Sequence, residues 1–160
     1  MSTGLVTRPR SRARSLANAL MAWVLRHGGG PSFLSLLTVR GRNSGQRRST
    51  PVAPVRRDDD LWVVAPYGPV AWVRNVQAAG RLELRRGRDR HAYDVRELDA
   101  EDAIPVLRAY LSMPSARFVR REFDVTARSS DDAIAAEAPR HPVFALTPAD
   151  PDDGRRGDAS

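Results

Sequence analysis

The residues best suited to chemistry in this sequence lie in a turn between two apolar runs, at 33–37 and 51–55. The turn combines arginines, glycines and small hydroxyl or amide side chains: Arg40, Gly41, Arg42, Asn43, Ser44, Gly45, Arg47, Arg48, Ser49 and Thr50. Guanidinium groups bind phosphate or carboxylate through paired hydrogen bonds, and glycine lets a backbone approach a ligand closely. We therefore expect a β-hairpin that binds an anion. The alternative is that its arginines are only solvated.

Several other chemistries are excluded or unsupported. The turn contains neither G-x-G-x-x-G between a strand and a helix nor G-K-[ST], so Rossmann and Walker phosphate binding are not supported. The chain has no cysteine, which excludes disulfides, thiolate metal sites and cysteine nucleophiles. Its three histidines, His27, His91 and His141, are too scattered to suggest a metal site, and no metal is expected.

The net charge of +7 comes from arginine, because the chain contains no lysine. Such a balance suits anionic ligands, nucleic acid or an acidic membrane surface. Aromatic residues are sparse and do not alternate with the arginines at 8–14, so a base-stacking surface is not indicated. We therefore expect no specific nucleic-acid partner.

Residues 16–25 are predicted to form an amphipathic helix with Leu16, Leu20, Trp23 and Val24 on one stripe. The segment is too short to span a bilayer and lacks a signal-peptide cleavage pattern. The stripe is expected to cover the core; the alternative is peripheral contact with a membrane surface. A cytoplasmic location is expected, with attachment at the inner face of the plasma membrane as the alternative.

The remaining pattern indicates one domain at 15–147, between a basic arm (1–14) and a polar tail (148–160) that are both expected to be disordered. Strands are predicted at 33–40, 48–57, 61–66, 81–86, 90–98 and 142–146, and helices at 70–79, 101–113 and 131–138. Hairpins dominate and no βαβ alternation occurs. The predicted fold is α+β, with about six mainly antiparallel strands in a partly closed barrel and flanking helices.

Three segments, in this order, resemble the deazaflavin (F420)-dependent nitroreductase family. They are Gly41-Arg42-Asn43-Ser44-Gly45-Gln46-x-Arg48-x-Thr50-Pro51, then Ala65-Pro66-Tyr67-Gly68, and then Ala71-Trp72-x-x-Asn75-x-x-Ala78. The resemblance implies the split β-barrel fold of pyridoxamine-phosphate oxidases. It also implies coenzyme F420 as cofactor, with hydride transfer to a quinone, nitro compound or enone as the small-molecule acceptor, in a monomer or homodimer.

The same resemblance implies roles for individual residues. The anionic coenzyme tail would lie against Arg42, Asn43, Ser44, Arg47 and Arg48, and the phosphate and ring along Arg48, Ser49, Thr50 and Pro51. The ring edge would meet the backbone of Ala65, Pro66, Tyr67 and Gly68, with Trp72 and Asn75 as walls of the site. Many relatives have lysine where Asn43 stands, and the loop between Gly68 and Trp72 is short.

Alternatives remain for these assignments. Trp72 could pack in the core, Asn75 could bridge backbone groups, and Tyr67 could serve only the turn. No catalytic residue is assigned; Tyr67, Tyr110 or water could supply a proton. The protein could also be a non-catalytic F420 carrier, or bind FMN in the same barrel.

Overall fold

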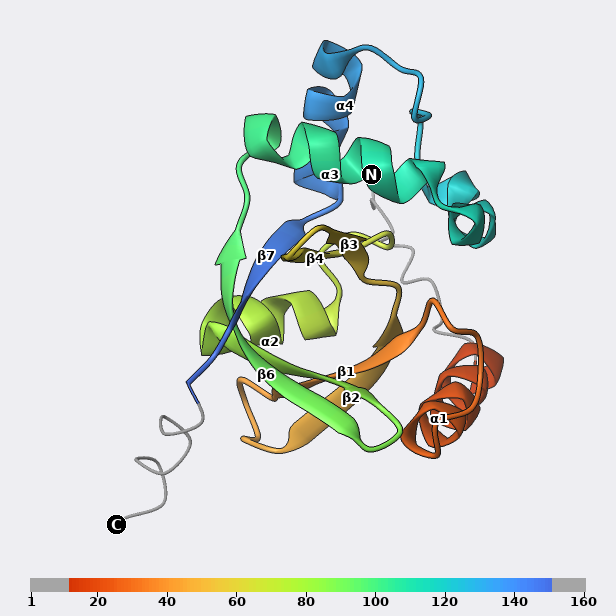
Figure 1. The fold of residues 1–160 in the computed structure, drawn as a ribbon, viewed down its shortest axis with the longest axis vertical. Coiled ribbons are helices and arrows are strands. Elements are labelled where there is room, and N and C mark those ends of the chain that lie inside the picture. The colour runs from red at the N-terminus through yellow and green to blue at the C-terminus, as the bar shows by residue number, and fades with distance from the viewer. Residues whose placement is uncertain (1–11, 151–160) are drawn as a thin grey trace, which may run out of the picture.

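The computed structural model describes residues 12–150, in which helices and short 3-10 turns surround one curled sheet (Figure 1). The helical elements are α1 (Arg12–Arg26), α2 (Ala71–Ala79), α3 (Ala100–Ser112), α4 (Asp131–Glu137), η1 (Pro114–Phe118), η2 (Arg120–Glu122) and η3 (Ala138–Arg140). The strands are β1 (Ser35–Arg40), β2 (Arg47–Val52), β3 (Val55–Arg57), β4 (Asp60–Val64), β5 (Arg81–Arg86), β6 (Asp89–Glu97) and β7 (Val143–Pro148).

The sheet has the strand order β2-β1-β5-β6-β7-β4-β3, and every neighbouring pair is antiparallel. β2 and β3 follow one another in the chain but form opposite edges of the sheet. The short link at 53–54 can join these edges only because the sheet curls round on itself. The predicted α+β fold with an incompletely closed antiparallel barrel is therefore confirmed.

The sequence predicted about six strands, whereas residues 12–150 form seven. The difference arises because the expected strand at 48–57 is divided at the link that contains Pro54. Proline has no N–H group to donate to a ladder. The chain leaves its pairing with β1 at Val52 and begins a new pairing with β4 at Val55.

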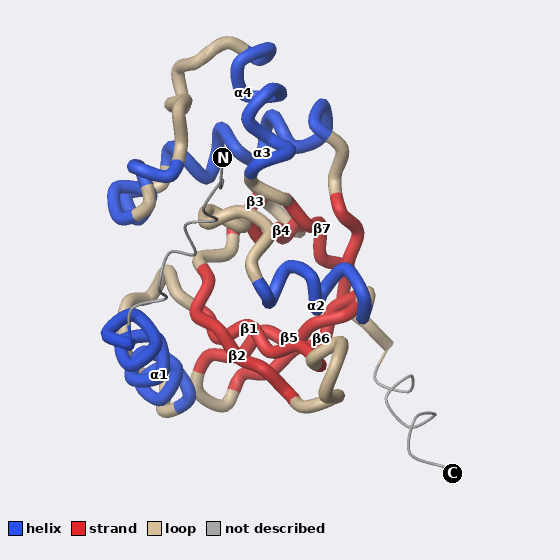
Figure 2. The backbone as a smooth tube through the Cα atoms, turned by 180° about the vertical axis from the view of Figure 1, so that it is seen from behind, coloured by secondary structure: helices blue, strands red, loops and turns tan. Residues whose placement is uncertain are grey.

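The interior of the barrel holds one hydrophobic cluster, to which α2 contributes Val73 and Val76. Figure 2 shows α2 between the strands β1, β2, β5 and β6 and the strands β3, β4 and β7. The helix ends where predicted, because Gly80 adopts a left-handed conformation (φ 66°) and donates its N–H to the carbonyl of Val76. Val73 and Val76 are fully buried on its inward face, whereas Ala79 is exposed.

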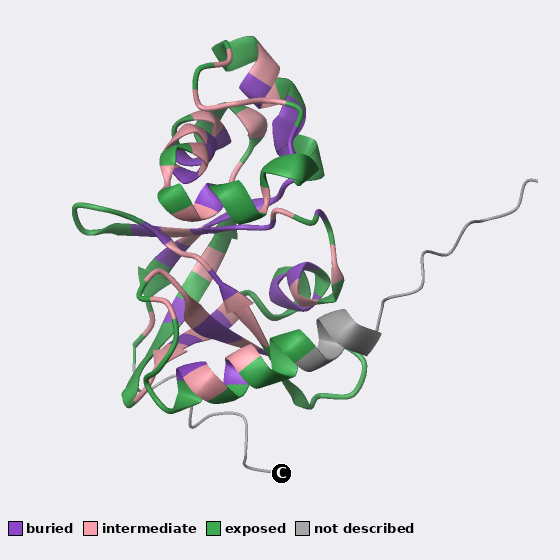
Figure 3. Cartoon of the chain, turned by 90° about the vertical axis from the view of Figure 1, so that its right-hand side faces the viewer, coloured by how far each residue is buried: buried purple, intermediate pink, exposed green. Residues whose placement is uncertain are grey.

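A second cluster lies where α3 packs on β3, β4 and β7 and α4 packs in turn on α3. Figure 3 shows the segments of this layer that carry buried residues, in purple, above the barrel. Asp99 caps α3 by accepting a hydrogen bond from the N–H of Asp102 at 2.8 Å. The helix therefore begins slightly before the predicted 101. This layer matters for the site because it supplies both Tyr110 and His141.

The predicted phase of the N-terminal helix is wrong. Within 17–26 of α1 the buried residues are Ala22 and Leu25, which contact Leu36 on the outer side of β1. Leu20 and Trp23, from the predicted buried stripe, are 64% and 57% exposed. Within residues 12–150, no helix combines the length and apolarity needed to cross a membrane. Peripheral membrane contact stays a prediction.

The expected disordered ends differ in extent from the structure. α1 begins at Arg12, so the last residues of the predicted 1–14 arm are helical. β7 extends to Pro148, and the N–H of Ala149 bonds to the carbonyl of Ala92 at 3.0 Å. The rest of the arm and of the tail, 1–11 and 151–160, lies outside the described residues.

Candidate functional site

The predicted arginine hairpin forms between β1 and β2, where Arg40 is paired with Arg47. The N–H of Gly41 bonds to the carbonyl of Gln46 at 2.7 Å, and the N–H of Gly45 bonds to the carbonyl of Gly41 at 2.9 Å. A Cβ atom at Gly41 would lie 3.1 Å from the Gln46 carbonyl oxygen, which explains why glycine stands there. The Ser44 hydroxyl accepts a bond from the N–H of Gln46 at 3.2 Å and so belongs to the turn.

The pleat of β2 divides the expected anion clamp between two faces. Successive strand residues point to opposite faces, and directly paired residues share a face. Arg48 and Thr50 are paired with Val39 and Leu37, which face the barrel interior. Arg47 and Ser49 therefore lie on the outer face, where the hydroxyl groups of Ser49 and Thr38 are 2.8 Å apart.

On that outer face Arg47 is already paired with an acid. Its Nη2 lies 3.1 Å from Glu83 Oε2, and Arg90 binds the same carboxylate at 3.1 Å. Burial alone would raise the pKa of Glu83, but the hydrogen bonds and charges of Arg90 and Arg47 together lower it below its usual value. The charge of Arg47 is thus compensated within the protein.

Arg42 is held differently, by neutral acceptors on α2. Its backbone N–H and its Nη1 both donate to Asn75 Oδ1, at 3.2 Å and 2.8 Å. Nη1 also lies 3.5 Å from the carbonyl of Ala71. Asn75 is only 5% exposed and ties the turn to the helix. Asn75 thus bonds both the backbone and the side chain of Arg42, whose charge has no acidic partner within residues 12–150.

Arg48 and Arg42 are thus the two cations of the turn best placed to receive a ligand anion. Within residues 12–150 neither forms an ion pair, and the guanidinium group of Arg48 makes no hydrogen bond. Asn43 is exposed at the tip of the turn. An anion approaching the rim of the barrel between β2 and α2 would meet both guanidinium groups.

The segment Ala65-Pro66-Tyr67-Gly68 follows β4 as a tightly bonded turn. The N–H of Ala65 bonds to the carbonyl of Pro142 at 2.9 Å, and the carbonyl of Ala65 accepts from Gly68 N–H at 3.2 Å. Gly68 has φ 81°, and a Cβ there would lie 3.2 Å from the carbonyl oxygen of Arg140. Tyr67 is 50% exposed, so its side chain is the part of the turn most open to a ligand.

The two tyrosines considered as proton donors differ in environment. Tyr110 is 5% exposed and packs against Phe123, with 6.0 Å between ring centroids. Burial raises the pKa of Tyr110, and Tyr67 raises it further. Tyr110 therefore holds its proton more tightly than an ordinary tyrosine.

Trp72 lies at the boundary between the two roles considered for it. It is partly buried and packs on the barrel cluster, with its ring centroid 6.1 Å from that of Phe144. Core packing is therefore part of its role. Part of the Trp72 side chain stays exposed, and Trp72 belongs to α2, the helix that also carries Asn75.

A cavity of about 670 Å³ lies at the other end of β2 from the arginine turn. Its floor belongs to the inner face of the sheet, where Leu84 is paired with His91 and Ser35 with Val52. The opposite walls come from the link and β3 at 54–56 and from Met113, just after α3. A volume of this size is typical of small-molecule sites.

The cavity exists because the inward-facing residues at the mouth of the barrel are small or polar, whereas those deeper in the same strands are large. Ser35 and His91 occupy inward-facing positions two residues before Leu37 and Tyr93 in their strands. The Tyr93 hydroxyl makes no hydrogen bond within residues 12–150, and no unpaired buried polar atom occurs there, so this hydroxyl opens to the cavity.

Sequence reasoning missed this cavity. None of its lining residues was among the predicted cofactor contacts. The available signal was the change from leucine to serine and from tyrosine to histidine at inward positions, which becomes visible only once strand register is known. The predicted residues that the structure does bring together are Arg42 and Asn75, with Arg48 on the same side of the sheet.

The sequence and the fold were then compared with known proteins. A family model described as F420H2-dependent quinone reductase matches residues 12–127. No match was found among curated proteins.

Two solved structures give comparable matches with the chain. A structure of an F420-H2 dependent reductase has a TM-score of 0.51 and 20% identity, and the match covers 72% of this chain and 95% of that one. A chain described as a domain-swapped dimer has a TM-score of 0.53 and 19% identity, with coverage of 84% and 96%.

A third neighbour is a Clostridium acetobutylicum protein of the pyridoxinephosphate oxidase family, related to general stress protein 26. Its TM-score is 0.50 at 11% identity, with coverage of 73% and 75%. Similarities at these levels of identity concern the fold, which all three share.

Proposed function

The chain belongs to the F420H2-dependent quinone reductase family and is an F420-dependent reductase, and we propose that it transfers a hydride from reduced F420 to a quinone bound in the cavity at the end of β2. Nitro compounds and enones, which accept a hydride in the same way, are the wider class of candidate acceptors. The physiological site is proposed to be a small-molecule site without a metal.

The arrangement along β2 carries this proposal. Arg48 lies near its first residue and the cavity begins beyond its last, roughly 13 Å away at about 3.3 Å per residue. A long coenzyme with an anionic tail and an aromatic ring fits these two ends. The tail would meet Arg42, Asn43, Ser44 and Arg48, while Thr50 lies on the way to the ring; Pro51 is paired with Leu36 and so faces outward.

The other expected contacts fit this placement to different degrees. Tyr67 and the exposed edge of Trp72 are available to the ring, together with the carbonyl groups around Ala65, Pro66 and Gly68. The N–H of Ala65 already donates a hydrogen bond to the carbonyl of Pro142 and so is not offered to the ring. Arg47 and Ser49 face outward, so the tail would reach them only by crossing the edge of β2.

Bound reduced F420 would supply the hydride, and the residues of this chain would orient the reactants and stabilise charge. Tyr93 and Ser35 place hydroxyl donors on the cavity floor, where they can face the oxygen of a quinone as it gains negative charge. Because burial raises the pKa of Tyr110, Tyr67 or water is the better proton donor.

The first test is a fluorescence titration with F420 and with FMN, followed by oxidation of reduced F420 by menadione. Tighter binding of F420, weakened by salt, and turnover with menadione are expected. Binding without oxidation would instead identify a carrier. Tighter binding of FMN would show that the barrel holds a flavin.

Two variants separate the halves of the proposed site. Arg48→Ala should weaken F420 binding by about tenfold or more, since a charge-assisted hydrogen bond contributes about 1.5–3 kcal/mol. Arg57→Ala removes another exposed strand arginine and is the matched control. Ser35→Leu should raise the KM for menadione and leave F420 affinity unchanged. Parent-like affinity in Arg48→Ala at low salt would remove the anion site.

A further inference from the structure

His141 and Glu137 form a buried polar pair behind the Ala65–Gly68 turn, residues 65–68. Their exposures are 3% and 5%, and His141 Nε2 lies 3.0 Å from Glu137 Oε1. The other ring nitrogen, Nδ1, lies 3.4 Å from the carbonyl oxygen of Ala65. The ring of Phe123 covers the imidazole, with centroids 4.0 Å apart and planes inclined by 25°.

The partners of this pair determine where the protons lie. Glu137 Oε1 also accepts from the N–H of Asp124 at 3.2 Å, and Oε2 accepts from Arg140 Nη1 at 3.3 Å. Glu137 thus acts as an acceptor on both oxygens, as a carboxylate does. A backbone carbonyl also only accepts. Both nitrogens of His141 therefore face acceptors, and only the imidazolium form carries a proton on each nitrogen.

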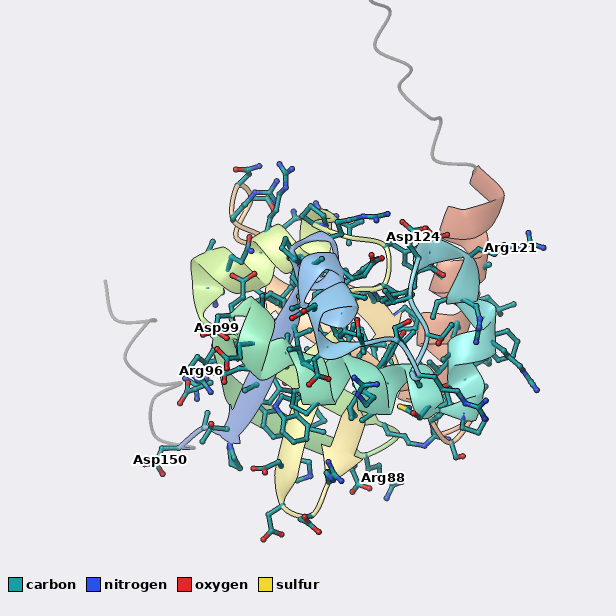
Figure 4. The ribbon with its side chains drawn as sticks, turned by 90° about the horizontal axis from the view of Figure 1, so that it is seen from above. Arg88, Arg96, Asp99, Arg121, Asp124 and Asp150 are labelled. Carbon is teal, nitrogen blue, oxygen red and sulfur yellow. The ribbon has the colours of Figure 1, made fainter. Side chains whose placement is uncertain are left out.

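The charges around His141 fit this assignment. Glu137 on α4, Arg140 on η3 and Asp124 before α4 are the charged groups of the network, and Arg140 also binds Asp124 at 2.7 Å. With an imidazolium the network holds two positive and two negative charges. Figure 4 shows Asp124 at the rim of the helical layer, where the network reaches solvent. The pKa of Asp124 is lowered, by Arg140 first and by His141 in smaller part.

We propose that His141 is a buried imidazolium that holds the carbonyl of Ala65 and so positions the turn at 65–68 for the cofactor ring. The functional half of this statement rests on the proposed contact between the turn and the ring. His141 is a positioning residue, since it acts through Ala65 and is itself covered.

The backbone around His141 strengthens its hold on the turn. The next residue, Pro142, accepts the N–H of Ala65, and Gly68 packs against the carbonyl of Arg140. His141 and Pro142 therefore bond both the carbonyl and the N–H of Ala65. Loss of the Nδ1 proton, or of the whole imidazole ring, removes the hydrogen bond from His141 to the carbonyl of Ala65. That carbonyl still accepts the N–H of Gly68 but is no longer held by His141.

The protonation state is tested by ¹⁵N NMR of the full chain labelled at histidine. His141 is expected to show two protonated ring nitrogens at neutral pH, and Glu137→Gln should convert it to a neutral ring with one. His27→Gln, which removes an exposed histidine just after α1, identifies the His27 signals and should leave the His141 signals unchanged. A single protonated nitrogen in the parent protein would overturn the assignment.

The positioning role is tested with His141→Phe, which keeps an aromatic ring against Phe123 and removes both hydrogen bonds. Amide exchange at Gly68 is expected to accelerate at least tenfold, and the KM for reduced F420 to rise several-fold more than kcat falls. Ile134→Val perturbs the same buried cluster without touching the pair and should change neither.

The outcomes distinguish this proposal from the proposed function. Unchanged Gly68 exchange in a folded His141→Phe protein would overturn the positioning role, whether or not F420 binds. Accelerated exchange with unchanged F420 affinity would show that the turn does not contact the ring, and would overturn the functional half. If the parent protein does not bind F420, the proposed function fails, whereas the NMR and exchange results still decide the structural half.

Discussion

Asn75 offers the sharpest perturbation of the proposed anion site, because two substitutions separate its structural bond from the charge of its partner. Its Oδ1 accepts both the N–H and the Nη1 of Arg42, at 3.2 Å and 2.8 Å. Asn75→Ala removes this acceptor from a nearly buried position. Asn75→Asp keeps an acceptor of the same shape but adds a negative charge beside the guanidinium group.

The expected magnitudes differ for the two variants. The loss of an acceptor for one charged and one neutral donor should lower the free energy of unfolding by about 1–3 kcal/mol in Asn75→Ala. For a chain of this length, that is a fall in Tm of roughly 3–10 °C. Asn75→Asp should keep most of the stability, because its carboxylate still accepts both bonds.

F420 affinity should fall in Asn75→Asp, the variant that keeps most of its stability. In Asn75→Asp the new carboxylate compensates the charge of Arg42, as Glu83 already does for Arg47. The coenzyme tail then loses about one charge-assisted interaction, which corresponds to weakening of about tenfold or more. Thermal melting and fluorescence titration at low and high salt measure the two effects. Parent-like affinity of Asn75→Asp at low salt would refute the assignment of Arg42 to the tail.

Two further predictions concern neighbouring features. Because the pKa of Glu83 is lowered in the folded protein, its stabilising effect is complete above the unfolded pKa of about 4.3 and is lost as pH falls through the lower folded pKa. The stability difference between the parent and Glu83→Gln, about 1 kcal/mol at pH 7, should therefore shrink in urea denaturation as pH falls below about 4, and a difference that stays the same in acid would contradict it. Trp72→Phe should keep the barrel folded at a cost of about 1 kcal/mol and remove part of the tryptophan quenching caused by F420; undiminished quenching would assign Trp72 to the core alone.

Local patterns predicted the elements of the sheet well where each strand carries its own signal. Leu82 and Leu84 alternate with charged residues, and β5 was placed at the bounds that the structure has. Gly80 ended α2 for the same local reason. The division of the expected strand 48–57 at Pro54 was not predicted. Its two parts differ in the strands with which they pair, β1 and β4, and no local pattern reveals those partners.

The phase of α1 failed for a related reason. A helix buries whichever stripe finds an apolar surface, and on the outer face of β1 the available apolar residue is Leu36, followed by Thr38 and Arg40 at the next outward positions. Ala22 and Leu25 meet that small surface, while Leu20 and Trp23 extend beyond it. The helix does carry an apolar stripe, but which of its residues become buried depends on Leu36, which lies 11 residues after Leu25 in the chain.

The arginines show most clearly what sequence alone can and cannot establish about the site. Composition indicates an anionic ligand, yet many of these guanidinium groups have structural tasks. Arg86 donates to the carbonyls of Gly30, Pro31 and Leu34, and Arg108 and Arg140 bind carboxylates of the helical layer. Arg47 is adjacent to Arg48 in sequence, but the pleat directs it to Glu83. An arginine is available to a ligand only when the fold gives it no acid, and that property depends on register and on residues tens of positions away. Arg42 and Arg48 satisfy this condition on the same side of the sheet, which is why the anion site is assigned to them and why a single carboxylate at position 75 should be enough to weaken it.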